Sequence, residues 1–475
     1  MENLRKKVVI VGGGITGLSA AFYTKKIFEE QQIPVDITIV EKSDRLGGKI
    51  QTLHHDGFII EKGPDSFLAR KQPIIELTKE LGLEDELVGT NPKAKSTFIL
   101  NKGKLHPMPP GLVFGIPTKV FPFIKTGLIS PLGKIRAAMD LVLPKRKEGG
   151  DESLGHFIER RLGKEVLENI TEPLLSGIYS GDARFLSIDS TFPQFKLMEE
   201  KHRSLIKGIV TSRHSPQPIT GLPEAAKKSM FLSYKNGLST LIDRLVEALH
   251  PIEILKGQEI EKLTKCEKGY KLILENGTEL QADGLVLAMP TSKAARLLPE
   301  LPNVKWLEEI PYVSVANIVL AFKKEDVAFP LNGSGFLVPR KEGRTMTACT
   351  WLSSKWLHTT PSGNVLFRVF VGRAGSQEWL KLSDQELLSA VSKDLHDMMG
   401  ITAKPYFTEI TRCFDSMPQY PVGHKEQLKI IRNQLEINRP GIYLCGAGYD
   451  GVGIPDCIQH GKKAAMETFE YLTAL

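Results

Sequence analysis

The amino-acid sequence predicts an α/β fold with three parts: a parallel sheet, a second sheet of mixed direction, and an inserted helical region. Two runs of apolar, mostly β-branched residues at 8–11 and 36–40 predict the parallel sheet, because strands buried on both faces read as continuous apolar runs. The alternation of strand and helix patterns is then lost between about 91 and 234 and returns afterwards, which separates the insertion from the rest.

The residues that follow the first strand predict a dinucleotide-binding turn. Gly12, Gly14 and Gly17 have the G-x-G-x-x-G spacing. In this motif the first glycine makes a tight turn, the second lets backbone N–H groups approach a pyrophosphate, and the third lets helix pack on strand. Glu41 ends the second strand, where an acid accepts hydrogen bonds from a ribose and disfavours a 2′-phosphate. The alternative is a glycine-rich turn with a structural glutamate.

Residues 41–49, Glu-Lys-Ser-Asp-Arg-Leu-Gly-Gly-Lys, resemble the second signature of a large group of FAD proteins that includes amine oxidase-like flavoproteins. The resemblance implies FAD, a close approach of the chain to the pyrophosphate at Gly48, and a phosphate neutralised by Lys49; a basic surface turn is the alternative. Residues 57–67 resemble the turn beside the isoalloxazine ring. The residues that the resemblance and the glycine motif assign to FAD are Gly12, Gly13, Gly14, Ile15, Thr16, Gly17, Glu41, Lys42, Gly48, Lys49, Gly63, Pro64, Asp65, Ser66, Ile260, Gly448, Val452, Gly453 and Ile454.

Composition is that of an ordinary globular protein. The 475 residues suffice for two or three domains. The net charge of +7 is mild; it fits an acidic substrate or an anionic membrane surface, although solubility alone would explain it, and we expect no nucleic-acid partner. The five cysteines lack metal-ligand spacing, so we expect reduced thiols and no metal. We also expect no signal peptide and no spanning helix, and therefore a cytoplasmic protein.

The element pattern divides the chain. We expect an FAD-binding part at residues 1–68, 235–292 and 409–475, a substrate-binding part at 69–90 and 293–408, and the helical insertion at 91–234. An amphipathic helix is expected at 73–88 and a hairpin turned by Lys102-Gly103 at 95–105. Helical pieces follow at 111–116, 118–125, 131–143, 153–162 and 164–175. The proline- and glycine-rich stretch 211–228 is expected to be a mobile surface loop.

Nucleotide-domain character returns near residue 235. We expect a helix at 237–250, strands at 252–255, 258–263, 270–274 and 279–282, and a buried strand at 283–290. Asn276-Gly277 is a strong hairpin signal within this series. The second sheet is expected from strands at 313–322, 335–339, 345–351 and 365–371, with a helix at 384–398. A strand and turn at 441–448 and a helix opening at 451–458 close the FAD site.

Two further stretches resemble signatures of porphyrinogen oxidases: Glu-Pro-Leu-Leu-Ser-Gly-Ile-Tyr-Ser-Gly-Asp at 172–182 and Met-Pro-Gln-Tyr-Pro-Val-Gly-His at 417–424. The resemblance implies an O2-dependent, FAD-catalysed six-electron oxidation of coproporphyrinogen III to coproporphyrin III in haem biosynthesis, with release of hydrogen peroxide. No cysteine stands where monoamine oxidases attach their flavin, so we expect non-covalent FAD. Eukaryotic protoporphyrinogen oxidases carry an arginine near Thr97 and an asparagine at Asp65, and both help to hold their substrate.

The cofactor carries the difficult chemistry in such an oxidase, so no strong acid–base dyad is required. By resemblance, Gly177 and Ile178 are the catalytic candidates that wall the space over the flavin. Arg70 and Lys71, together with Asp65, are the candidates for substrate binding, because coproporphyrinogen carries four carboxylates; solvated helix-end charges are the alternative for the first two. His106, His202 and His424 have no partner spacing, and we expect them to be structural.

Several readings stay open at this point. A protoporphyrinogen IX oxidase, another flavin amine oxidase or desaturase, and a non-catalytic escort protein of the FAD fold are the alternatives. The partners expected beside substrate and O2 are a ferrochelatase that receives the product and the inner face of the cell membrane. The amphipathic, proline-broken stretch 111–143 would make the membrane contact, unless it only caps the substrate cavity.

Overall fold

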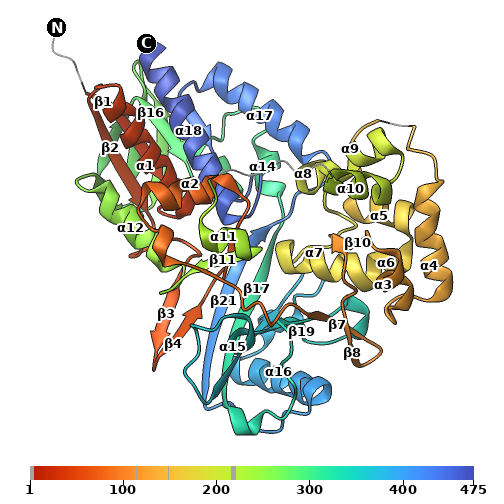
Figure 1. Cartoon of the computed structure of the whole chain (residues 1–475). Coiled ribbons are helices and arrows are strands. Elements are labelled where there is room, and N and C mark those ends of the chain that lie inside the picture. The colour runs from red at the N-terminus through yellow and green to blue at the C-terminus, as the bar shows by residue number, and fades with distance from the viewer. Residues whose placement is uncertain (1–4, 114, 148, 215–220, 475) are drawn as a thin grey trace.

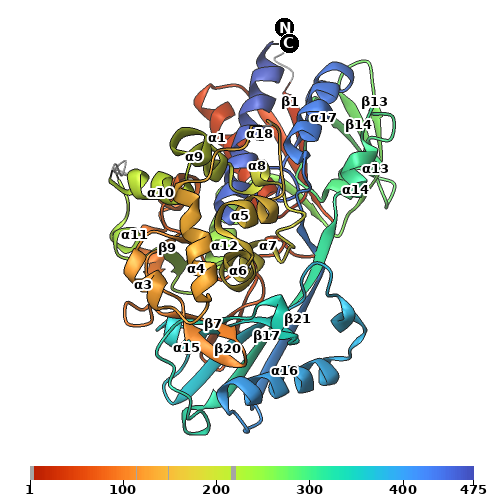
Figure 2. The same ribbon diagram turned by 90° about the vertical axis from the view of Figure 1, so that its right-hand side faces the viewer.

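A computed structural model describes residues 5–113, 115–147, 149–214 and 221–474 (Figure 1). The described residues nearest the two termini lie at the same end of the molecule, beside a five-stranded parallel sheet, and a larger sheet lies at the opposite end (Figures 1 and 2). The insertion packs to one side of both sheets. The α/β fold with two sheets and a helical insertion is therefore confirmed.

The parallel sheet has the strand order β12-β2-β1-β16-β22. Its strands are β1 (Lys6–Val11), β2 (Val35–Glu41), β12 (Glu253–Lys256), β16 (Gly284–Leu287) and β22 (Ile442–Leu444). Because side chains alternate along a strand, Val8 and Ile10 join one core while Val9 and Val11 join another. The first core is completed by α1 (Ile15–Glu30), α2 (Gln72–Glu80), α12 (Ser239–Leu249) and α18 (Ile454–Ala474).

The opposite face of this sheet is covered by a three-stranded ribbon and three helices. The ribbon comprises β13 (Ile260–Lys265), β14 (Tyr270–Leu274) and β15 (Glu279–Ala282). Its turn contains Gly277 at φ +84°, and Thr278 N donates to Asn276 Oδ1 at 2.9 Å, which confirms the Asn276-Gly277 hairpin. The helices are α13 (Thr291–Leu297), α14 (Lys305–Glu309) and α17 (His424–Asn438). The sequence analysis missed α17, although Leu428, Ile431 and Leu435 recur with helical spacing and are buried.

The larger sheet has seven strands in the order β21-β17-β20-β19-β18-β7-β8. The strands are β7 (Thr97–Asn101), β8 (Lys104–Pro107), β17 (Tyr312–Lys323), β18 (Gly335–Leu337), β19 (Met346–Trp351), β20 (Asn364–Val371) and β21 (Phe407–Pro418). Helix α16 (Asp384–Met399) covers one face, as Figure 2 shows. The expected hairpin at 95–105 forms, but it pairs into this sheet through β18 and not within the insertion. Strand β21 likewise belongs to this sheet, whereas the expected FAD-binding part began at 409.

Shorter strands join the two ends of the molecule. The hairpin of β3 (Thr52–His55) and β4 (Phe58–Glu61) packs on the larger sheet through Phe58 and Ile60. A second small sheet has the order β5-β11-β6 and consists of β5 (Phe67–Leu68), β6 (Leu87–Gly89) and β11 (Phe231–Tyr234). These pieces fix the segment that leads from the parallel sheet into residues 62–66.

The insertion is a cluster of short helices around a core of its own. It contains α3 (Val120–Lys125), α4 (Pro131–Ala138), α5 (Leu154–Leu162), α6 (Lys164–Val166), α7 (Glu172–Tyr179), α8 (Ile188–Thr191), α9 (Pro193–His202) and α10 (Leu205–His214), with a π-helical turn at Leu167–Thr171 before α7. The helix expected at 111–116 is wrong. Gly111 at φ +91° and Gly115 at φ +86° turn the chain instead into the hairpin of β9 (Leu112–Val113) and β10 (Ile116–Pro117).

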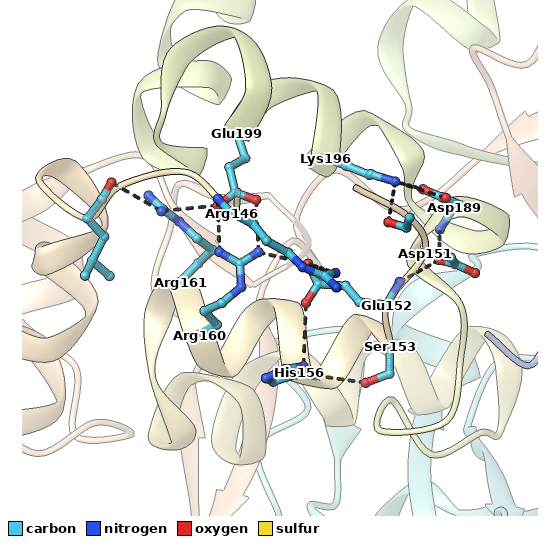
Figure 3. Close-up of polar contacts among 12 residues, drawn as sticks. Arg146, Asp151, Glu152, Ser153, His156, Arg160, Arg161, Asp189, Lys196 and Glu199 are labelled. Atoms are coloured by element: carbon cyan, nitrogen blue, oxygen red, sulfur yellow. Dashed lines mark hydrogen bonds and ion pairs between the residues drawn. The ribbon is translucent and has the colours of Figure 1, made fainter. Parts of the chain in front are cut away.

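A charged network holds the insertion helices together (Figure 3). Arg160 donates to Glu199 at 2.6 Å and to Glu152 at 2.9 Å. Arg161 Nε donates to Asp140 Oδ1 at 2.6 Å, and both side chains are fully buried. Buried charges of this kind require partners, and this network supplies them between the helices of the insertion. The stretch expected to be a loop at 211–228 instead includes the end of α10 and α11 (Glu224–Lys228), while 215–220 lie outside the described residues.

Candidate active site

The glycine turn after β1 has the geometry of a dinucleotide cradle. A Cβ on Gly17 would overlap the Gly12 carbonyl oxygen, and one on Gly12 would overlap the Ala288 carbonyl oxygen. A Cβ on Gly14 would meet only Gly48 Cα, at 3.9 Å. Gly12 and Gly17 are therefore required because the neighbouring backbone leaves no room for a side chain. The space beside Gly14, at the N-terminus of α1, stays free for a ligand, and the positive end of a helix favours phosphate.

Glu41 organises this turn. Its carboxylate accepts from Gly13 N at 2.5 Å and from Ser43 N at 2.8 Å. Lys42, which the sequence analysis assigned to FAD, lies exposed and forms an ion pair with Glu259. Gln258 N donates to the Glu41 carbonyl at 3.0 Å, which brings the start of β13, and with it Ile260, beside the acid. The two ends of the expected nucleotide site, far apart in the sequence, thus lie together.

The second signature passes directly over the glycine turn. An isolated parallel bridge joins Gly14 to Gly47, and Gly48 has φ +58°, a conformation that other residues rarely adopt. Lys49 Nζ donates to the Ser416 carbonyl of β21, and burial lowers the pKa of this amine. Lys49 thus ties the nucleotide side of the molecule to the larger sheet, in addition to any role toward a phosphate.

These observations together fit a dinucleotide such as FAD. The open space at Gly14, the two backbones that meet without side chains at Gly14 and Gly48, and the acid at the end of β2 are the features such a cofactor requires. The other assigned positions lie on the elements around this turn. Ile15 and Thr16 are buried in the first turn of α1, Gly448 packs against Tyr312 and Thr291, and Val452, Gly453 and Ile454 lead into α18.

The segment at residues 62–66 is held by one cation from β20 and one from α15 (Leu352–Lys355). Arg368 of β20 donates to the Gly63 carbonyl, and its Nε donates to Asn317 Oδ1 at 3.1 Å. Asp65 lies 2.9 Å from Lys355 Nζ and 3.7 Å from Arg368 Nη1. Burial opposes ionisation of Asp65, but the two cations outweigh it and hold its pKa well below the usual value.

The sequence analysis missed both Arg368 and Lys355. Arg368 is the single charge within the otherwise apolar run of β20, Val-Leu-Phe-Arg-Val-Phe-Val, and it is only 2% exposed. A lone charge in a buried strand requires a partner, and this was a signal that the sequence offered. Asp65, expected to contact substrate and cofactor, is already paired with these two side chains, and Ser66 Oγ donates to it at 2.7 Å. Pro64, directly before Asp65, is partly buried.

The two stretches at 172–182 and 417–424 come together in the structure. Gln419 Nε2 donates to the Tyr179 carbonyl at 2.9 Å, and Ser187 N donates to the Tyr420 carbonyl at 2.8 Å. Tyr420 OH donates to the Ala447 carbonyl in the turn after β22. Helix α7 is therefore fixed relative to the turn that precedes α18. On its open side Gly177 has no atom within 4 Å of a Cβ built on it, and Ile178 is 39% exposed.

The two basic candidates lie at the edge of this region. Lys71 Nζ lies 2.8 Å from Asp456 Oδ1 in the first turn of α18. Arg70 is exposed and has no polar partner among the residues that the structure describes. Thr97, by contrast, is the first residue of β7, and its hydroxyl lies 3.0 Å from Ser334 Oγ. Among the described residues, Arg70 is thus an unpaired cation and Lys71 a paired one.

The three histidines have different surroundings. His424 is fully buried, its Nε2 lies 2.6 Å from the Tyr449 carbonyl, and burial lowers its pKa to about 4. His106 and His202 are half-buried. The described part of the chain contains no group of side chains with the arrangement of a metal site. It also contains no helix long and apolar enough to cross a bilayer.

Comparison with known proteins agrees with this geometry. The sequence model of flavin-containing amine oxidoreductases matches residues 15–468. The chain is 46% identical to the coproporphyrinogen III oxidase of Bacillus subtilis, with 99% of this chain and 100% of that protein covered. It is 40% identical to the coproporphyrinogen III oxidase of Staphylococcus aureus, with the same coverage. A solved structure from Exiguobacterium is 38% identical and covers 98% of this chain and 99% of its own, with a TM-score of 0.87.

Proposed function

We propose, from the premise that this chain belongs to the family of flavin-containing amine oxidoreductases, that it is an FAD-dependent coproporphyrinogen III oxidase. The observation that carries the proposal is the full-length similarity to coproporphyrinogen III oxidases at 46% and 40% identity. The site agrees, because a nucleotide cradle, a cation-held segment at 62–66 and the open side of α7 converge in one region. The reaction converts coproporphyrinogen III to coproporphyrin III.

FAD, when bound, supplies a two-electron acceptor that O2 reoxidises, so three rounds with three O2 molecules remove six electrons and yield three hydrogen peroxide molecules. The chain itself binds, orients and excludes water. Glu41 and the turn at Gly14 bind the nucleotide, which we expect to be held without a covalent bond. Gly177 and Ile178 place a small apolar wall where the methylene bridge reacts. Arg70 and Lys71 attract the carboxylates of the substrate.

The charge at the site favours a tetra-acid over protoporphyrinogen IX. The two substrates differ at two ring positions, where coproporphyrinogen carries propionates and protoporphyrinogen carries vinyl groups. A carboxylate that loses water without gaining a partner costs several kcal/mol, so a closed apolar pocket would reject coproporphyrinogen. Arg70 is free among the described residues and exposed, which leaves one end of the site wet and basic.

The test is a comparison of substrates on the purified, yellow holoprotein. Coproporphyrinogen III and protoporphyrinogen IX are prepared anaerobically, and product fluorescence and hydrogen peroxide are followed after air is admitted, with a primary amine as the third substrate. We expect the highest kcat/KM with coproporphyrinogen III and no peroxide with the amine. A higher kcat/KM with protoporphyrinogen IX would overturn the substrate assignment, and peroxide only with the amine would overturn the function.

We also propose that the cytoplasmic protein contacts the inner face of the cell membrane and passes its product to a ferrochelatase. The support for the membrane contact is a set of exposed apolar side chains on α3 and α4. Phe121, Ile124, Leu132 and Ile135 are 67%, 56%, 78% and 63% exposed, and Lys125 lies beside Phe121. Apolar side chains with flanking lysines favour an anionic interface. Flotation with liposomes that contain anionic lipid at low salt tests this contact, and absence of binding would leave these helices as a cap over the cavity.

A further inference from the structure

A pair of arginines lies beneath α7, outside the contacts described so far. Arg340 follows β18, and Arg373 follows β20. Helix α7 packs across the strands β18 and β19 at this end of the sheet (Figure 1). The loop that carries Arg373 is fixed to the helix, because Ala374 N donates to the Ser180 carbonyl, directly after α7, at 2.8 Å. Both arginines therefore belong to the same layer as the helix that carries Gly177 and Ile178.

Glu172 contacts the guanidinium group of Arg340 and acts on that of Arg373 only through its charge. Arg340 Nε lies 3.1 Å from Glu172 Oε1, and Arg340 Nη1 donates to the Ala374 carbonyl at 2.8 Å. Arg373 Nη1 donates to the Val338 carbonyl at 3.2 Å. Burial and the charge of Arg340 lower the pKa of Arg373 to about 10, and Glu172 alone opposes them. At neutral pH the group thus carries two positive charges and at most one negative charge.

Two buried polar atoms of this layer have no hydrogen-bond partner among the described residues. Arg340 Nη2 is buried and has no partner among the described residues, and the same holds for Ser176 Oγ, one helical turn after Glu172 on α7. Arg373 is 4% exposed, and within the described ranges its guanidinium group donates only to the Val338 carbonyl. Buried donors and uncompensated charge are costly, and a guanidinium pair matches the two oxygens of a carboxylate.

We infer that Arg340 and Arg373 form a subsite for one carboxylate of the tetrapyrrole, beneath α7. The inference rests on the proposed function and deepens it, because it assigns a propionate a partner inside the protein. A carboxylate held at Arg373 and another near Lys71 would fix the orientation of the macrocycle relative to Gly177. The pair would thereby decide which methylene bridge faces the reacting centre.

The experiment measures binding apart from turnover. Coproporphyrin III, the tetra-acid product, is titrated into holoprotein by fluorescence, and its tetramethyl ester serves as the uncharged probe. For Arg373→Met and Arg340→Met we expect the Kd of the tetra-acid to rise about 10- to 100-fold, with the Kd of the ester within about threefold of its original value. The KM for coproporphyrinogen should rise in parallel, while the flavin spectrum, which reports the cofactor site, stays nearly unchanged.

Arg344→Met is the matched control. Arg344 lies on the same loop as Arg340, between β18 and β19. It pairs instead with Asp397 at 2.6 Å and with Asp394 at 3.5 Å on α16, so its loss should leave the Kd of the tetra-acid and that of the ester unchanged. Arg373→Lys keeps a charge and should recover part of the affinity if Arg373→Met folds poorly. An unchanged Kd for the tetra-acid in both methionine variants overturns the subsite, as does an equal loss for the ester. A failure of the proposed function is distinguishable from a failure of the subsite, because in the first case the unmutated protein itself would not oxidise coproporphyrinogen.

Discussion

The substitution Gly14→Val separates the roles of the three glycines in the nucleotide turn. Gly14 has φ −75° and ψ 176°, which any residue adopts, and a Cβ there would meet only Gly48 Cα at 3.9 Å. We therefore expect the variant to fold with a free energy of unfolding within about 1 kcal/mol of the unmutated apoprotein. The valine side chain fills the space in which the pyrophosphate must lie, so the protein should purify colourless.

The magnitude follows from linkage between binding and folding. A ligand at 100 times its Kd stabilises the folded state by about 2.7 kcal/mol. Added FAD should therefore raise the unfolding midpoint of the unmutated apoprotein and leave that of Gly14→Val unchanged. The assay is urea unfolding with and without FAD, together with the flavin absorbance of the purified protein.

Gly17→Ala is the contrasting variant. Its Cβ would overlap the Gly12 carbonyl oxygen, and such overpacking costs about 1–3 kcal/mol or more. We expect this variant to lose stability even without FAD. Retention of stoichiometric flavin by Gly14→Val would refute the reasoning about Gly14, and equal destabilisation of both apoproteins would show that Gly14 is also required for packing.

Three further predictions concern single side chains. The pKa of His424 is lowered from 6.5 to about 4 in the folded state, so on acidification the unfolded chain binds the proton first. The free energy of unfolding should therefore fall by up to about 3 kcal/mol as the pH drops from 6.5 to 4. Urea unfolding of His424→Gln should lack this pH dependence. Arg161→Met leaves the buried Asp140 without its cationic partner and should cost about 3–5 kcal/mol in thermal or urea unfolding. Arg244→Met removes an exposed ion pair and should cost less than about 1 kcal/mol. Lys71→Ala should lower kcat/KM for coproporphyrinogen by about 1–2 kcal/mol, and less for protoporphyrinogen; an equal kcat/KM in the variant would mean that Lys71 serves only Asp456.

Local patterns in the sequence determined much of the fold. The apolar run at 8–11, the glycines that follow it and Glu41 predict a strand, a tight turn and an acid at the end of the second strand, and the structure has all three. The expected helix at 384–398 is α16, where the side chains of Ser383 and Glu386 form a capping box. Such features depend on neighbours a few residues away, so composition and spacing are sufficient to predict them. The same holds for the hairpin at Asn276-Gly277.

Only the tertiary structure decided which distant segments pair. The hairpin of β7 and β8 joins the larger sheet because Phe98 pairs with Phe336, more than two hundred residues later in the chain. Asp65 likewise contacts Lys355 and Arg368, about three hundred residues later in the chain, only because the folded structure brings these segments together. An edge strand offers hydrogen bonds to any strand that reaches it. The residue pattern of a strand therefore does not identify the strand with which it pairs. The glycine turn and the acid at the end of β2 therefore follow from local patterns, whereas Lys355 and Arg368 reach Asp65 only through the packing of distant segments.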